Sequence, residues 1–201
     1  GRAAARARAA RPRLAVVAAS VERLLVDGCD FLDLATPPRW LIERVLQDGQ
    51  VVSLTAPTNS GQTAVLLAMM MSVIGGVDFG PHPVRRKGRV LVLCGEDPDG
   101  FRLRMLATMA HMQVSREQIA GNLRVLPRAM ALTEALPELQ RECQTWGDVA
   151  LVVVDTSVAF FSGEDENNNQ QAYAHAQDLR ALRELPGKPS VVVDCHPADG
   201  A

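Results

Sequence analysis

A loop between a short apolar run and a helical segment has the layout of a phosphate-binding Walker A loop. The apolar run is 51–55 (VVSLT), and the helical segment is 61–74. Such a loop directs backbone N–H groups and a helix N-terminus at phosphate, with glycine wherever a side chain would block the approach. Gly61 meets that last requirement, and Thr63 is placed to offer its hydroxyl to Mg²⁺. The expected nucleotide-binding residues are Ala56, Pro57, Thr58, Asn59, Ser60, Gly61, Gln62 and Thr63. An ordinary strand-to-helix turn is the alternative, and the loop alone does not exclude it.

Gln62 stands where such loops carry lysine. A lysine places a full positive charge on the β- and γ-phosphates, whereas an amide donates a hydrogen bond and neutralises nothing. Hydrogen bonds to charged groups contribute about 1.5–3 kcal/mol, and neutral ones about 0.5–1.5 kcal/mol. We therefore expect glutamine to cost about 1–2 kcal/mol of phosphate affinity, or about tenfold, and more at the transition state.

Three further polar residues follow apolar runs that read as buried strands. Glu96 is expected to polarise an attacking water, and Asp155 to hold Mg²⁺, often through water. His196 would place a polar group beside the nucleotide, because ligands bind at the carboxyl ends of parallel strands. Each residue has a plainer interpretation. A buried strand can end in aspartate without a metal, Glu96 precedes a helix N-cap at Asp97, and a lone histidine is more often structural.

From residue 50 onward the chain alternates strand-like and helical patterns. Strands are expected at 51–55, 89–94, 122–126, 150–154 and 190–193, and helices at 61–74, from 97 onward, at about 133–146 and at 169–185. The strands are rich in β-branched residues and continuously apolar. This pattern predicts an α/β fold with a mainly parallel sheet of at least five strands and helices on both faces.

The N-terminal segment differs from the rest in composition. Residues 1–13 alternate alanine and arginine, and 14–27 can form a short helix that Gly28 would end. We expect 1–35 to be a basic tail with this short helix, and 36–201 to be the core domain. Because the chain starts at Gly1 and stops soon after a strand-like run, we expect the core to be truncated at its C-terminus.

The charge and composition of the chain limit the classes of partner that it is expected to bind. A formal net charge of −2 argues against a general nucleic-acid-coating surface, although a local basic groove would be compatible with it. Aromatic residues make up 4% of the chain, which leaves few platforms for stacking bases. The four cysteines are scattered, which favours reduced thiols in a cytoplasmic protein. No apolar run approaches the roughly 20 residues that span a bilayer, so we expect no membrane partner.

The order of these motifs resembles the RepA-type ATPases. These are RecA/DnaB-like P-loop proteins of plasmids, phages and bacterial genomes, commonly described as AAA family ATPases. The matching motifs are PPRWLIERVL, the loop at 56–63, GRVLVLCGEDP, Arg102 with Arg104, LVVVDT, GEDEN and a strand ending in CHP. The resemblance implies a RecA-like P-loop NTPase fold, ATP with Mg²⁺ as ligands, and assembly into a homo-oligomeric ring, often a hexamer. In helicase members it also implies ATP-driven movement on single-stranded DNA.

The same resemblance implies roles by motif position. Glu96 would be the catalytic glutamate, Asp155 the Walker B aspartate and metal ligand, and His196 the sensor at the strand end. Thr63 would be the other Mg²⁺ ligand.

The chain departs from that family at Gln62 and again after His196. Relatives commonly carry a basic residue there that reaches a neighbouring subunit's phosphates, whereas this chain has Ala198-Asp199-Gly200. Two positive charges near the γ-phosphate are therefore absent. The sequence leaves open whether a C-terminal segment replaces either one, or Arg102, Arg104 or Lys188 does.

Three functions remain open on these residues. The leading hypothesis is a replication or helicase-type ATPase domain that acts as a ring and drives DNA-strand movement by ATP hydrolysis. The alternative is a degenerate nucleotide-binding or structural ring subunit with little or no hydrolysis, because of Gln62. A P-loop regulator or small-molecule kinase is disfavoured, because no lid with clustered arginines is visible.

Overall fold

The computed structural model describes residues 25–57, 59–165 and 168–196, and it divides into two units between Pro37 and Pro38. In the first unit, helix α1 (Gly28–Asp33) begins after Asp27, whose side chain accepts a hydrogen bond from the Cys29 N–H at 2.8 Å. The prediction that Gly28 ends a helix is therefore wrong, because Asp27 caps a helix that starts there. Residues 14–24 of that expected helix lie outside the described residues.

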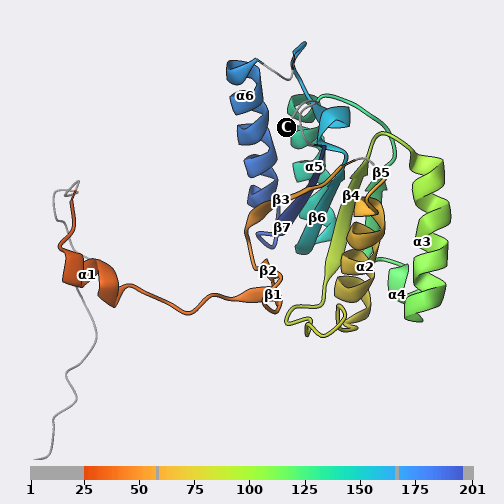
Figure 1. Ribbon diagram of the computed structural model, residues 1–201, viewed down its shortest axis with the longest axis horizontal. Helices are drawn as coiled ribbons and strands as arrows, with labels where there is room; N and C mark the ends of the chain where they lie inside the picture. The colour runs from red at the N-terminus through yellow and green to blue at the C-terminus, as the bar shows by residue number, and fades with distance from the viewer. Residues whose placement is uncertain (1–24, 58, 166–167, 197–201) are drawn as a thin grey trace, which may run out of the picture. The chain divides into compact units, whose positions relative to one another are not determined.

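The second unit is built on a five-stranded sheet in which every neighbouring pair is parallel (Figure 1). The strands are β3 (Val51–Thr55), β4 (Arg89–Cys94), β5 (Leu123–Leu126), β6 (Val149–Asp155) and β7 (Ser190–Cys195), in the spatial order β3-β7-β6-β4-β5. All five predicted strands are present, with small differences at their ends. β6 is buried along its whole length, whereas the edge strand β3 is partly exposed. The predicted α/β class with a parallel sheet is confirmed.

Helices cover both faces of this sheet. They are α2 (Gln62–Gly75), α3 (Pro98–Met112), α4 (Arg116–Ile119), α5 (Leu132–Trp146) and α6 (Asn169–Ala181), with short 3-10 turns η1 (Ser157–Phe160) and η2 (Leu182–Glu184). Alternate residues of a strand point to opposite faces, so Val90 and Val92 pack with α2 and α3, while Leu91 and Leu93 pack with α5 and α6. Figure 1 shows α2 and α3 on one side of the sheet and α5 and α6 on the other. Among the described residues, no helix is long and apolar enough to cross a membrane.

A small hairpin, which the sequence analysis did not predict, precedes the sheet. Strands β1 (Trp40–Ile42) and β2 (Leu46–Gln47) pair antiparallel, and Leu41, Ile42 and Leu46 are buried in the core beside α2. The hydroxyl of Ser190 donates to the Gln47 carbonyl at 2.9 Å, which ties the hairpin to the start of β7. The hairpin therefore closes the amino-terminal edge of the sheet.

The opposite edge gathers the polar connections. The loop from β3 to α2, the turn from β4 to α3 and the segments after β6 and β7 all leave the sheet at its carboxyl edge, because the strands are parallel (Figure 1). In parallel α/β sheets this is the edge at which ligands bind.

Candidate functional site

The loop between β3 and α2 opens onto a cleft of about 400 Å³ at the carboxyl edge of the sheet. Gly61 has a φ of +87°, in the left-handed region that favours glycine, and a Cβ at this position would meet nothing within 4 Å. No described side chain caps α2, so its N-terminus is open to a ligand. The loop therefore has the open backbone and the helix terminus that an anion requires.

The side chain of Gln62 faces the strand ends. It is 6% exposed, and its Nε2 donates to the Leu54 carbonyl at 3.2 Å and to the Cys195 carbonyl at 3.0 Å. Those carbonyls belong to the paired strands β3 and β7. The amide thus joins the two strands, and the expected donation from Gln62 to phosphate stays a prediction.

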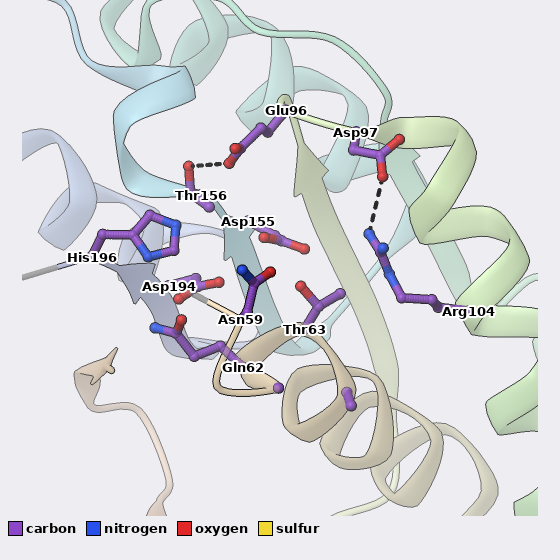
Figure 2. Close-up of a pocket in the computed structure, with 12 residues that line it drawn as sticks. Asn59, Gln62, Thr63, Glu96, Asp97, Arg104, Asp155, Thr156, Asp194 and His196 are labelled. Atoms are coloured by element: carbon purple, nitrogen blue, oxygen red, sulfur yellow. Dashed lines mark hydrogen bonds and ion pairs between the residues drawn. The ribbon is translucent and has the colours of Figure 1, made fainter. Parts of the chain in front are cut away.

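Two aspartates lie side by side behind the loop (Figure 2). Strands β6 and β7 pair in register through Val154 and Val193, which brings Asp155 and Asp194 together as the next residues of each strand. Asp155 is 6% exposed and Asp194 is 2% exposed, and Asp194 Oδ1 has no hydrogen-bond partner among the described residues. Because a buried oxygen without a partner is costly, this pair is suited to a cation.

The pKa values of both carboxyls are raised. Burial raises the pKa of Asp155 to about 6, and the neighbouring Asp194 and Glu96 carboxylates act in the same direction. Burial likewise raises the pKa of Asp194, against the opposing effect of His196. The pair therefore resists double ionisation until a positive charge offsets it.

Glu96 enters the cleft from the end of β4. It is exposed, and the Thr156 hydroxyl donates to its Oε2 at 3.1 Å (Figure 2). Thr156 directly follows β6, so this hydrogen bond joins the ends of two neighbouring strands. It fixes the orientation of the Glu96 carboxylate at the cleft.

Ionisable groups on either side complete the lining. His196 follows β7 and is exposed. On the other side of Figure 2, Arg104 of α3 reaches Asp97 with an N–O distance of 3.3 Å. Asp97 also caps α3, because its Oδ1 accepts from the Gly100 N–H at 2.9 Å. The predicted N-cap at Asp97 is therefore confirmed.

The structure brings most of the predicted site residues together. Those that line the cleft are Asn59, Gly61, Gln62, Thr63, Glu96, Asp155 and His196. Ala56, Pro57 and Ser60 belong to the loop but are not among the lining residues, and Thr58 lies outside the described residues. Phosphate contacts from these four residues stay predictions.

The sequence interpretation missed Asp194 and Thr156. A signal for Asp194 was present, because the string VVVD occurs twice, at 152–155 and 191–194. Two such strands paired in parallel and in register bring their aspartates to the same edge. Thr156 had no comparable signal, since its role depends on the position of Glu96 in the neighbouring strand.

These residues fit a nucleotide with a divalent cation. The open Gly61 backbone suits phosphate, and buried carboxylate oxygens suit Mg²⁺. Among the described residues, no group of three or more histidine, cysteine, aspartate or glutamate side chains could hold a metal alone. This agrees with the usual coordination of Mg²⁺, in which one or two carboxylates bind the ion and phosphate and water complete its coordination shell.

A glycine loop, a strand-end aspartate and a strand-end glutamate on a parallel α/β sheet define a P-loop NTPase of the RecA-like type. A family model described as an AAA domain matches residues 18–199 of this chain. The chain therefore belongs to the AAA domain family, and this membership implies an ATPase-type domain that binds nucleotide, usually with a divalent metal. No curated protein matches the sequence.

Proposed function

We propose that this chain is the ATP-binding and ATP-hydrolysing domain of a RepA-type replication or helicase motor with a degenerate Walker A loop. The observation that carries the proposal is that Gly61, Glu96 and Asp155 meet in one cleft, although they follow or end three different strands. An ordinary strand-to-helix turn would not need carboxylates on the two neighbouring strand ends. The motor assignment itself rests on the order of motifs along the chain.

The residues divide the work of phosphoryl transfer between them. Mg²⁺, when bound, supplies the positive charge that offsets the β- and γ-phosphates. Thr63 and Asp155 would hold it, through water or directly, and the α2 N-terminus would receive the phosphates. Glu96 accepts a proton from the attacking water, and the Thr156 hydrogen bond keeps its carboxylate in position. His196, which lines the cleft, would respond to the γ-phosphate.

The proposal extends to a ring of copies that moves single-stranded DNA. Glu96 and His196 are both exposed on the cleft, so a neighbouring subunit has access to the same phosphates. A basic residue from that subunit would supply charge that this chain lacks after His196. The ring and the DNA partner are supported by the motif resemblance. Because aromatic residues make up only 4% of the chain, DNA contact would depend on basic side chains more than on stacked bases.

A second candidate is nucleotide binding with little turnover. It is favoured by Gln62, whose amide hydrogens are engaged by the Leu54 and Cys195 carbonyls. Charge stabilisation dominates phosphoryl-transfer catalysis, so its loss affects the rate more than the affinity. Such a subunit would bind Mg-ATP and change shape or assembly without hydrolysing it.

Steady-state ATP hydrolysis with and without single-stranded DNA separates the two candidates. The motor predicts turnover that DNA accelerates and that Glu96→Gln abolishes, while ATP affinity is retained. The matched control is Glu134→Gln, which changes an exposed glutamate in the first turn of α5. Binding without turnover in the wild-type chain would select the second candidate. Turnover that persists in Glu96→Gln would remove Glu96 from its role.

A further inference from the structure

The cleft is short of positive charge. Its described lining carries four carboxylates, from Glu96, Asp97, Asp155 and Asp194, whereas the only cationic or potentially cationic side chains are Arg104 and His196. Gln62, at the position where such loops carry lysine, has a neutral amide that donates to the Leu54 and Cys195 carbonyls. A divalent cation would offset the buried aspartates, but a nucleotide's phosphates still need a donor of their own.

Of the three cations that the sequence left open, the structure brings one to the cleft. Arg102 pairs with Asp99 at 2.7 Å and lines a separate apolar pocket beside Phe101 and Met105. Lys188 pairs with Glu184 and precedes β7, at the amino edge of the sheet. Arg104 lines the cleft itself, and Figure 2 shows it extending from α3 on the side where Thr63 lies.

The charge of Arg104 also acts on the metal-binding side of the cleft. Asp155, the carboxylate that would hold Mg²⁺, lines the same cleft as the Arg104 guanidinium. Arg104 is therefore electrostatically coupled to the residue that would hold Mg²⁺ against the phosphates.

The present partner of Arg104 is easily exchanged. The Arg104–Asp97 pair has an N–O distance of 3.3 Å, and its side chains are 48% and 55% exposed. Exposed pairs of this kind contribute little to stability. A phosphate is the better partner, because the planar guanidinium can donate two parallel hydrogen bonds to its oxygens. Asp97 stays in place when Arg104 leaves, since the cap to Gly100 holds it.

We propose that Arg104 is the phosphate-binding cation of this cleft, in place of the lysine that Gln62 replaces, and that it leaves Asp97 when the nucleotide enters. This inference rests on the proposed nucleotide site. It assigns the charge of the missing Walker A lysine to a residue of the chain's own α3. A neighbouring subunit is then not needed to supply that charge.

The test is an equilibrium titration of the purified chain with a fluorescent ATP analogue and Mg²⁺ at fixed ionic strength. Arg104→Ala should weaken binding by about ten- to hundredfold, because the charged hydrogen-bond donor to the phosphates is lost altogether. Arg104→Lys should lie in between, because it keeps the charge and loses the planar fork. The control Arg102→Ala, two residues away on the same helix and also exposed, should bind as the wild type does.

A rescue variant tests the replacement directly. Arg104→Ala combined with Gln62→Lys should recover most of the lost affinity, because the charge returns to its usual position. Circular dichroism and thermal melting of each variant report folding separately. If the wild type binds and Arg104→Ala binds equally well, the assignment of Arg104 is overturned while the nucleotide site stands. If the folded double variant recovers nothing, Arg104 does not replace the lysine. If the wild type binds no nucleotide, the site and this inference both fail.

Discussion

Replacing Asp155 with asparagine should stabilise the metal-free protein at neutral pH, although it removes a residue of the proposed active site. Asp155 is 6% exposed and lies against Asp194, and its pKa is raised to about 6 by burial and by the Asp194 and Glu96 carboxylates. The ordinary value is 3.8. In the unfolded chain the carboxyl loses its proton first, so ionisation favours unfolding.

The direction and size of the effect follow from that displacement. The pKa of Asp155 is higher in the folded state than in the unfolded state. The contribution of the protonated carboxyl to the free energy of unfolding is therefore fully present below about pH 4, and it is lost as pH rises through about 6. A displacement of about two units corresponds to about 3 kcal/mol. An asparagine side chain cannot ionise, and its amide can still donate a hydrogen bond to Asp194. The free energy of unfolding of Asp155→Asn, relative to wild type, should therefore rise by up to about 3 kcal/mol between pH 4 and pH 7.

Urea unfolding in EDTA at a series of pH values measures this difference. Asp99→Asn, which removes an exposed carboxylate of α3, controls for the general effect of losing one negative charge. Adding Mg²⁺ should reduce the difference in free energy of unfolding between Asp155→Asn and wild type at pH 7, because a cation bound at Asp155 stabilises the wild type and not the variant. A stability difference that does not change between pH 4 and pH 7 would refute the claim that buried, adjacent carboxylates set this titration.

Three further substitutions test the surroundings of the cleft. Gly61→Ala should lower the free energy of unfolding by about 1–2 kcal/mol, because Gly61 has a φ of +87°. It should also weaken ATP binding. Unchanged stability in thermal or urea unfolding would contradict the left-handed conformation. Gln62→Leu should destabilise the chain by about 1–3 kcal/mol, since two part-buried carbonyls lose their donor. A neutral result would show that the amide does not join β3 to β7. Thr156→Val should lower the hydrolysis rate while leaving ATP affinity unchanged, and an equal loss in both would mean that Thr156 does more than orient Glu96.

The sheet could be predicted because its strands are locally unambiguous. RVLVLC at 89–94 and the run ending in VVVD at 155 are continuously apolar and β-branched, and both form strands close to the expected bounds. The hairpin of β1 and β2 could not be found this way, because strands of two and three residues carry no periodicity. Its burial depends on contacts with α2 that are remote in sequence.

The site was predictable by position and not by orientation. Gly61, Glu96 and Asp155 were found because each follows or ends a strand-like run, and parallel strands bring such residues to one edge. The direction of a side chain is set by tertiary contacts. The Gln62 amide turns to the ends of β3 and β7, and Arg104 reaches the cleft while Arg102 does not.

The most direct test of the central claim is a calorimetric titration of ATP into the purified chain, with Mg²⁺ and then with EDTA. The account predicts saturable binding of one ATP per chain that weakens strongly when Mg²⁺ is removed, because the carboxylates at Asp155 and Asp194 then repel the phosphates. Absence of binding at millimolar ATP with Mg²⁺, or binding that is indifferent to the metal, would contradict it.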